Sequence, residues 1–418
     1  MPTVERESRD ETARALFELT EEIADKELRP AAAAAEREGK FPREEFRLLG
    51  RSGLLGLPYP EELGGAAQPY ETYLQVVEEL AGAWLTIGLG LSVHVLSCFP
   101  LATAGTREQQ QRWLPDLLGG DLLGAYCLSE PGSGSDAAAV RTSAHESDGE
   151  FIVNGTKAWI SHAGMADFYT LFARTSGEPD GPDRSRGISC FHVPAQTDGV
   201  LVAQPEHKMG MRGSVTAQVT FSGAAVPAAQ LVGERDRGFS IALAALDAGR
   251  LGIAACATGL AQAALDAAVA YAGQRRQFGK SIIEFQGLSF MLADMATAVA
   301  AARALYLAAA RRKDAGLSYG REAAMAKLFA SDAAMRVTTD AVQVLGGYGY
   351  VEDFPAERYM REAKVLQIVE GTNQIQRMVI GRSLAASDRA AGGSGGSSPR
   401  VSAVGGPGGS SPRAGTNR

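Results

Sequence analysis

The sequence predicts a mainly α-helical protein with a small central β domain between two helical regions. Alanine-rich stretches recur at 31–35, 254–270 and 296–310, and alanine is the strongest helix former. Between about 126 and 233 the residue pattern changes to runs of β-branched and aromatic residues separated by turn dipeptides, which is typical of strands. The chain of 418 residues is also longer than one core usually holds. We therefore expect an N-terminal helical domain, a central β domain, a C-terminal helical bundle and a disordered tail at residues 1–125, 126–233, 234–385 and 386–418, respectively.

The N-terminal region has a helical rhythm. Apolar residues within 15–23 fall on one face of a helix. We expect Pro30 and the Gly-Lys-Phe-Pro stretch at 39–42 to break that helix. Thr106, three residues before Gln109, is typical of the capped start of a further helix.

The central region contains a hairpin signal. The apolar run at 151–153 lies between two turn dipeptides, Asp148–Gly149 and Asn154–Gly155. Three further runs are expected to form strands because aromatic and β-branched residues dominate them: 168–172, 188–193 and 217–221.

Residues 238–385 return to long helices rich in alanine and leucine, with glycine corners at 346–349 and Gly371. This rhythm predicts a helical bundle. The last 28 residues contain 9 Gly, 6 Ser and 3 Pro, too little apolar surface to offset the entropy of ordering, so we expect a disordered tail.

Composition excludes several functions. A net charge of −7 does not favour nucleic acid. The charged N-terminus does not resemble a secretory signal. The most apolar stretch, 83–101, is interrupted by glycine and proline and is expected to be a buried helix rather than a membrane span. Dispersed cysteines predict no disulfide, no metal site and a reducing, cytoplasmic location: Cys98, Cys127, Cys190 and Cys256.

Six short stretches suit contacts with a ligand, although each also has a plain structural explanation. A glycine-broken loop brings backbone N–H groups near a ligand but is more often a surface turn. A tryptophan beside hydroxyls could cover a flat cofactor or simply be half-buried on a strand. Paired arginines could clamp a pyrophosphate or merely end a helix. The stretches are YCLSEPGSGSD (126–136), KAWIS (157–161), LDAGR (246–250), RRQFGKSIIEFQ (275–286), QVLGGYGY (343–350) and QIVEGTNQIQR (367–377).

The last stretch contains Glu370, which follows two apolar residues and precedes Gly371 at an expected break between helices. A glutamate is normally exposed, because an unpaired buried charge is costly. Similarly, the i,i+3 spacing of Asp247 and Arg250 fits a solvated ion pair. Taken singly, all of these residues would be assigned to the surface.

Together, the order, spacing and identity of the six stretches resemble the acyl-CoA dehydrogenase family over about residues 10–385. The resemblance implies an N-terminal helical domain, a small β-barrel or sandwich domain and a C-terminal four-helix bundle. It also implies FAD as cofactor and α,β-dehydrogenation of an acyl-CoA thioester to the trans-2-enoyl-CoA. Such an oxidoreductase, a flavoprotein, would act in fatty acid or branched-chain acyl-CoA metabolism.

The family pattern places FAD where the β domain meets the helices. Leu128 and Ser129 would lie nearest the flavin ring, with Ser161 close to its N5 atom. Other positions would reach the FAD of a neighbouring subunit, which implies a homo-oligomer, commonly a homotetramer built as a dimer of dimers. The cofactor-binding positions carried over are Tyr126, Cys127, Leu128, Ser129, Gly134, Ser135, Trp159, Ile160, Ser161, Arg275, Phe278, Gln286, Gln343, Val344, Leu345, Gly346, Gly347, Thr372, Asn373 and Gln374.

The same resemblance makes Glu370 the catalytic base. It would remove the pro-R α-proton while the β-hydride passes to flavin N5, and an apolar pocket should raise its pKa. In other branches of the family the base lies at the position of Gly249. Glycine has no side chain that could act as a base, so the resemblance favours the short-, medium- or short-branched-chain type. The substrate-side positions are Ser135, Asp247, Ala248, Gly249, Arg250 and Gly371.

Two alternatives stay open at this point. One is a same-fold acyl-CoA oxidase or a dehydrogenase of carrier-protein thioesters; the other is a non-catalytic acyl-thioester-binding protein. An electron-transfer flavoprotein is the acceptor that the resemblance implies. The acyl chain length depends on how the helices at 80–105 and 245–260 pack.

Overall fold

The computed structural model describes residue 4 and residues 6–392, with side chains as far as residue 385. The chain divides into two compact units, 1–380 and 381–418. The helices are α1 (Glu11–Ile23), α2 (Arg29–Glu38), α3 (Arg43–Arg51), α4 (Tyr70–Ala83), α5 (Leu85–Ala104), α6 (Arg107–Leu118), α7 (Gly238–Gln274), α8 (Gln286–Asp314), α9 (Gly320–Leu345), α10 (Ala356–Leu366) and α11 (Asn373–Gly392). The strands are β1 (Gly124–Cys127), β2 (Ser143–Ser147), β3 (Glu150–Ser161), β4 (Phe168–Arg174), β5 (Ile188–Pro194), β6 (Val200–Val202), β7 (Thr216–Pro227), β8 (Leu231–Val232), β9 (Arg276–Gln277) and β10 (Lys280–Ser281).

The N-terminal helices differ from expectation at one point. Pro30 does not break the first helix, because a π-helical turn at Ala24–Leu28 joins α1 to α2 and Pro30 lies at the first turn of α2, where no amide donor is needed. The break at Gly39 is confirmed, since it takes the left-handed conformation (φ +67°). The capped start of α6 is also confirmed: Thr106 and Gln109 form a reciprocal capping box.

The central strands form one sheet in the order β6-β7-β3-β2-β4-β5-β8, with β1 pairing parallel to β4. The runs expected at 168–172, 188–193 and 217–221 lie in β4, β5 and β7. The Asp148–Gly149 turn closes the β2–β3 hairpin, as expected. The Asn154–Gly155 turn does not form; instead β3 continues through it with a register shift, and Gly155 has φ +149°. Glycine tolerates the unusual backbone conformation of a bulge as readily as that of a turn.

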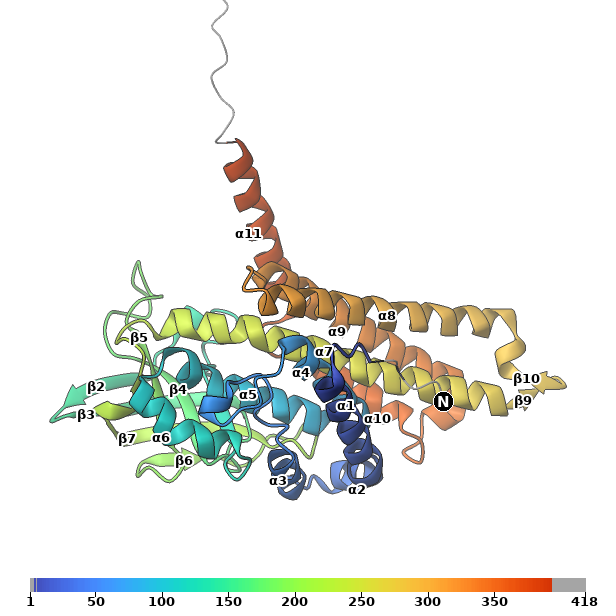
Figure 1. The fold of residues 1–418 in the computed structure, drawn as a ribbon, viewed down its shortest axis with the longest axis horizontal. Coiled ribbons are helices and arrows are strands. Elements are labelled where there is room, and N and C mark those ends of the chain that lie inside the picture. The colour runs from blue at the N-terminus through green and yellow to red at the C-terminus, as the bar shows by residue number, and fades with distance from the viewer. Residues whose placement is uncertain (1–3, 5, 393–418) are drawn as a thin grey trace, which may run out of the picture. The chain divides into compact units, whose positions relative to one another are not determined.

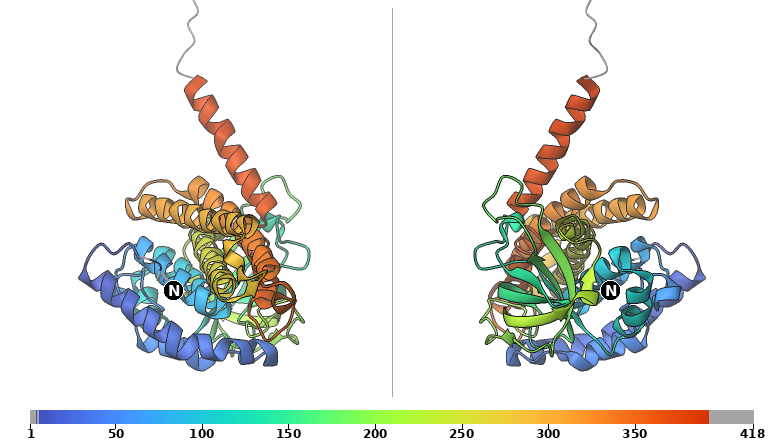
Figure 2. Two further views of the ribbon diagram at one scale, coloured as in Figure 1. Left: turned by 90° about the vertical axis from the view of Figure 1, so that its right-hand side faces the viewer. Right: turned by 90° about the vertical axis from the view of Figure 1, so that its left-hand side faces the viewer.

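The C-terminal region is a bundle in which α7 packs against α4, α5, α8 and α9. With 37 residues, α7 is about 55 Å long. It begins beside β5, where an added Cβ on Gly238 would lie 2.6 Å from the Ser189 carbonyl carbon. It ends at Arg275, next to the β9–β10 hairpin. The sheet and this hairpin therefore lie at opposite ends of the long helices (Figure 1), and Figure 2 (right) views them from the sheet end.

By length and mean hydropathy alone, α5, α7 and α8 are each sufficient to cross a membrane. The most apolar window of α5 is 89% buried inside the protein, as expected for the stretch at 83–101. The corresponding window is 61% buried in α7 and only 28% buried in α8. Helix α8 therefore leaves most of an apolar stretch uncovered by its own chain.

The expected tail at 386–418 begins within α11, whose helix continues to Gly392. Residues 393–418 lie outside the described part of the chain. Residues 386–392 continue the helix because the start of the tail is rich in alanine, and the expectation of a disordered tail stays a prediction.

Three histidines are buried within residues 1–380. The ring of His94 accepts a hydrogen bond from the Gly124 N–H at 3.0 Å, and His162 Nδ1 lies 2.9 Å from the Gly124 carbonyl oxygen. The ring of His192 stacks on Trp113 with centroids 4.6 Å apart. Burial lowers the pKa of each histidine to about 4, so all three are neutral in the folded protein near pH 7.

We expect the free energy of unfolding to fall as the pH decreases from 6.5 towards 4. In the unfolded chain these histidines become protonated near pH 6.5, and in the folded protein only near pH 4. Between these two pH values the unfolded state therefore binds more protons than the folded state. Each such histidine lowers stability by up to about 1.4 kcal/mol per pH unit. Two buried glutamates, Glu362 and Glu370, partly oppose this fall above about pH 4.5, because burial raises their pKa to about 8 and about 7 and the folded state protonates them first. Urea unfolding followed by tryptophan fluorescence across this range measures the slope. His192→Gln should make the slope smaller by up to about 1.4 kcal/mol per pH unit, and a slope identical to wild type would contradict the assignment.

Candidate active site

Glu370 lies in the turn between α10 and α11 with an unusual backbone conformation. Its φ is +52° and that of Gly371 is +87°. Left-handed geometry is uncommon for a residue with a side chain and is often found at functional sites. The conformation directs the side chain inward: both carboxylate oxygens are buried and accept no hydrogen bond from the described residues. Burial raises the pKa of Glu370 to about 7, opposed in part by the charges of Lys327 and Arg250.

The carboxylate faces Gly249 on α7. A Cβ added to Gly249 would overlap Glu370 Oε2 and lie 2.9 Å from the carboxyl carbon. A residue with a side chain at this point of α7 would therefore occupy space that the carboxylate now fills. The two positions that the family resemblance connected, 249 and 370, are adjacent in the structure.

The groups nearest the carboxylate on its other sides are neutral or already paired. Tyr70, Tyr73 and Tyr126 all have a pKa raised by burial, and proximity to Glu370 contributes to each shift. The expected ion pair between Asp247 and Arg250 forms, but it is not fully solvated, since the Arg250 side chain is only 7% exposed. Glu370 thus lacks a direct partner in a mostly uncharged environment.

A cavity of about 220 Å³ opens beside this carboxylate between α4, α5 and α7. Its wall includes Ala248 and Gly249 from α7, and its remaining surface is mainly aromatic and aliphatic. Residues from the helices at 80–105 and 245–260 line it. The other lining residues are Pro58, Tyr59, Pro60, Tyr70, Ser92, Val95, Leu96, Phe99, Ala102, Thr103 and Lys313.

The loop at 128–136 is anchored from below by a buried ion pair. Lys157 on β3 is fully buried and donates to Glu130 at 2.8 Å and to the Leu128 carbonyl at 3.0 Å. The Ala158 N–H donates to the Ser129 carbonyl at 2.9 Å. These contacts place the loop beside β3. Both residues lie within stretches that the sequence singled out, at 126–136 and 157–161, but the ion pair between them was not predicted.

The side chain of Trp159 is exposed on β3, next to the loop at 128–136. It lies where β3 shifts register against β7, has φ +62° and is 66% exposed. Gly134 and Ser135 are exposed on the neighbouring loop, and Ser161 is partly exposed. A strained, exposed indole near accessible hydroxyls fits a flat ligand such as the FAD isoalloxazine.

Several expected cofactor residues have buried side chains and offer only their backbone to a ligand. Cys127 and Ile160 pack within the sheet core, and Val344 and Leu345 are buried at the end of α9. The Asn373 side chain is 3% exposed and bonded to α9. Gln374 is exposed, and Thr372 partly so.

The remaining cofactor positions form a second group far from the first. Arg275 and Phe278 lie at the distal end of α7, with Phe278 94% exposed. Gln286 begins α8 and is exposed, as are Gln343 and the glycines at 346–347 at the end of α9. Tyr126 of the first group donates to the Ala242 carbonyl near the start of α7. Arg275 lies about 50 Å further along this helix, so one chain does not bring these two positions together.

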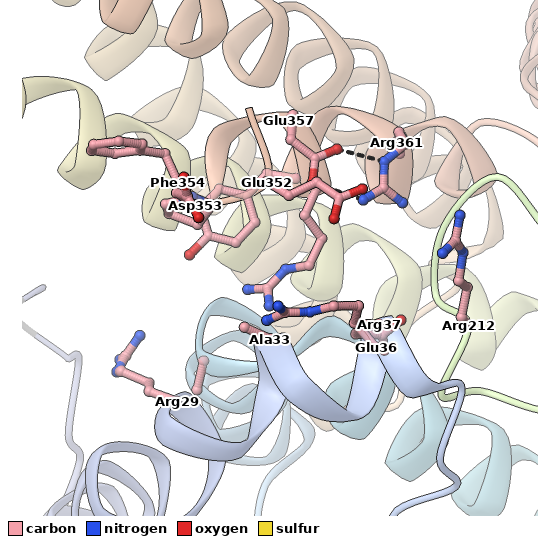
Figure 3. Close-up of a pocket in the computed structure, with 14 residues that line it drawn as sticks. Arg29, Ala33, Glu36, Arg37, Arg212, Glu352, Asp353, Phe354, Glu357 and Arg361 are labelled. Carbon is pink, nitrogen blue, oxygen red and sulfur yellow. Dashed lines mark hydrogen bonds and ion pairs between the residues drawn. The ribbon is translucent and has the colours of Figure 1, made fainter. Parts of the chain in front are cut away.

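A second cavity of about 280 Å³ lies between α2 and α10 (Figure 3). None of the site residues expected from the sequence lines it. Arg29 is paired with Glu79 at 2.8 Å, and Arg361 with Glu357 at 2.6 Å. Charged side chains, among them Arg29, Glu357 and Arg361, line this cavity, so it is unsuited to an apolar acyl chain.

Comparison with known proteins agrees with this arrangement over most of the described chain. Models of the acyl-CoA dehydrogenase N-terminal, middle and C-terminal domains match residues 10–121, 125–224 and 236–385. The mitochondrial short-chain specific acyl-CoA dehydrogenase of Mus musculus is 43% identical over 380 residues, which is 91% of this chain and 91% of that protein.

Solved structures give the same result. Butyryl-CoA dehydrogenase from Megasphaera elsdenii superposes with a TM-score of 0.88 at 39% identity, covering 91% of this chain and 100% of that one. A chain in the structure described as the electron transferring flavoprotein of Acidaminococcus fermentans has a TM-score of 0.87 at 42% identity, covering 90% of this chain and 98% of that one.

Proposed function

The chain belongs to the acyl-CoA dehydrogenase family, and from this premise we propose that Glu370 is the base that removes the α-proton of its acyl-CoA substrate. The enzyme is an FAD-dependent oxidoreductase that converts an acyl-CoA thioester to the trans-2-enoyl-CoA. Bound FAD supplies the acceptor for the β-hydride. One observation carries the assignment: a buried carboxylate without a hydrogen-bond partner faces Gly249 beside an apolar cavity.

The environment of Glu370 suits this chemistry. An α-C–H bond is a weak acid, so the base needs a higher pKa than an ordinary glutamate has. Burial supplies it, raising the pKa of Glu370 to about 7. The backbone N–H of the same residue is proposed to donate to the thioester carbonyl and so stabilise the enolate.

We further propose a short acyl chain as substrate. The cavity is small, about 220 Å³, and bulky side chains such as Tyr59, Leu96 and Phe99 line it. A relative of similar length acts on butyryl-CoA according to its name.

The active form is proposed to be a homotetramer built as a dimer of dimers. Tyr126 contacts α7 at Ala242, and Arg275 lies about 50 Å further along that helix, so a second copy must supply Arg275 if both groups bind one FAD. Helix α8 also leaves an apolar face uncovered, including Phe290 at 60% exposure. A second copy covering this face would bury it.

The proposed electron acceptor is an electron-transfer flavoprotein, and the proposed location is the cytoplasm. The exposed Trp159 offers a partner close access to the expected flavin edge. All four cysteines are free and buried, which fits a reducing compartment.

Anaerobic addition of butyryl-CoA to the purified yellow protein is expected to bleach the flavin absorbance within the mixing time of a manual assay. Hexanoyl- and longer acyl-CoAs should bleach it more slowly, because the cavity is short. Spectrophotometric measurements with acyl-CoAs of increasing length give the order of their bleaching rates. Absence of bleaching with every acyl-CoA, together with retained binding, would show a non-catalytic thioester-binding protein.

Reoxidation separates dehydrogenase from oxidase. After reduction, air should reoxidise the flavin much more slowly than the enzyme turns over with an electron-transfer flavoprotein. Air reoxidation as fast as turnover would make the protein an oxidase instead. Bleaching by an acyl-carrier-protein thioester but not by acyl-CoA would identify the alternative substrate class.

A further inference from the structure

A buried lysine lies beneath the turn that carries Glu370. Lys327 belongs to α9 and is 0% exposed. Its ammonium donates to the Gly371 carbonyl at 3.0 Å and to Asn373 Oδ1 at 2.8 Å. A buried ammonium is costly unless its environment compensates it, and both acceptors here follow Glu370 within three residues.

These contacts hold a backbone conformation that is unfavourable by itself. Glu370 and Gly371 are both left-handed, and a residue with a Cβ resists that geometry. Gln376 Nε2 donates to the Gly371 carbonyl at 2.8 Å and to the Glu370 carbonyl at 3.2 Å. Lys327 and Gln376 therefore fix the carbonyls of the turn from two sides.

Asn373 ties the same turn to α9. Besides accepting from Lys327, its amide donates to Ser331 Oγ at 2.9 Å and to Asp332 Oδ1 at 2.7 Å. Ser331 and Asp332 lie one helical turn beyond Lys327 on α9. The turn and α9 therefore form one hydrogen-bonded block, and the position of the Glu370 carboxylate against Gly249 depends on it.

Lys327 also acts on Glu370 through its charge. It is the strongest of the two cations that lower the pKa of Glu370; the other, Arg250, is paired with Asp247. Burial lowers the pKa of Lys327 to about 8, so it is mainly protonated at pH 7. The other titratable or charged groups that face Glu370 or Lys327 are Tyr70, Tyr73, Tyr126, Cys256 and Asp332.

We propose that Lys327 is a positioning residue for the base: its ammonium anchors the strained turn that presents Glu370 and places a positive charge beneath the carboxylate. This inference rests on the proposed role of Glu370. It assigns two separable effects to one side chain, a hydrogen bond that sets geometry and a charge that favours the ionised carboxylate. A purely structural lysine would provide only the first.

The test compares two neutral replacements in the FAD-loaded enzyme. Lys327→Gln keeps a donor but loses the charge, and Lys327→Met loses both. Infrared spectroscopy titrates Glu370 directly through its protonated-carboxyl band, which is identified by its loss in Glu370→Gln. Without the cation, the midpoint of this titration should rise by about one unit or more in both variants. At pH 7 the rate of flavin reduction by butyryl-CoA should then fall about fivefold in Lys327→Gln, because the ionised fraction of Glu370 falls from about one half to about a tenth, and further in Lys327→Met.

Two controls separate charge from packing. Ser331→Ala removes one hydrogen bond to Asn373 but keeps the ammonium, and Lys327→Arg keeps the charge; both should leave the midpoint unchanged. A midpoint in Lys327→Gln within about 0.3 units of wild type, with normal FAD content, would overturn the proposal. So would loss of folding in both neutral variants, which would make Lys327 a stability residue. The two proposals can also fail separately. If Glu370→Gln stays active while the Glu370 titration midpoint still shifts in the Lys327 variants, Glu370 is not the base, but the coupling between Lys327 and Glu370 stands.

Discussion

Replacing Glu370 with glutamine is expected to leave the protein folded, yellow and able to bind acyl-CoA, but to lower the rate of flavin reduction at least about a hundredfold. Glutamine has nearly the same shape, so the space against Gly249 stays filled. It has no basic oxygen with a suitable pKa, so the α-proton has no acceptor. Stopped-flow reduction with butyryl-CoA and the flavin-to-protein absorbance ratio measure the two parts of this expectation.

A matched control lies on α10. Glu362 is also a buried glutamate, 2% exposed, and burial raises its pKa to about 8. Its nearest cation is Arg358, with 3.8 Å between Arg358 Nε and a carboxylate oxygen. In Glu362→Gln, butyryl-CoA should therefore reduce the flavin at close to the wild-type rate. Near-normal reduction in Glu370→Gln would discard Glu370 as the base, and a Glu362→Gln variant as slow as Glu370→Gln would show that loss of any buried carboxylate disturbs the enzyme.

The secondary structure was largely predictable where local sequence decides it. The strand at 168–174 follows from its aromatic and β-branched residues, and the start of α6 from the Thr106–Gln109 capping box. The errors occur where one local signal has two outcomes. Asn154–Gly155 makes a bulge within β3 rather than a turn, and Pro30 is accommodated because a π-helical turn precedes it. Pairing with β7 decides the first case, and helix register decides the second.

The candidate site was predictable only through the joint pattern of the motifs. Nothing local indicates that Glu370 is buried, since burial depends on α7 and α9 packing over it. Lys327 lies on an alanine-rich helix and becomes significant only through acceptors 44 and 46 residues later. Lys157 and Glu130 likewise pair across 27 residues. Single-residue statistics place such charges on the surface, so their roles require tertiary structure.

Gly249→Ala is expected to keep the fold but to lower the rate of flavin reduction about ten- to a hundredfold. Alanine suits a helix interior better than glycine by about 1 kcal/mol, so α7 should tolerate it. The added methyl group would overlap the Glu370 carboxylate, which is the flexible end of a side chain and must move away. A displacement of about 1 Å at a reacting group can cost about a hundredfold in rate. Stopped-flow reduction and thermal unfolding of the same preparation measure the two effects.

Gly273→Ala is the matched control, because Gly273 lies on the same helix and an added Cβ would meet no other atom within 4 Å. It should match wild type in rate and be at least as stable. The comparison isolates the position of the base, whereas Glu370→Gln isolates its chemistry. Full activity in Gly249→Ala would mean that the carboxylate does not work from beside α7, so the geometry of the Glu370 turn would no longer explain catalysis. A slow Gly249→Ala with a normal Gly273→Ala would show that the missing side chain at 249 is what leaves room for the base.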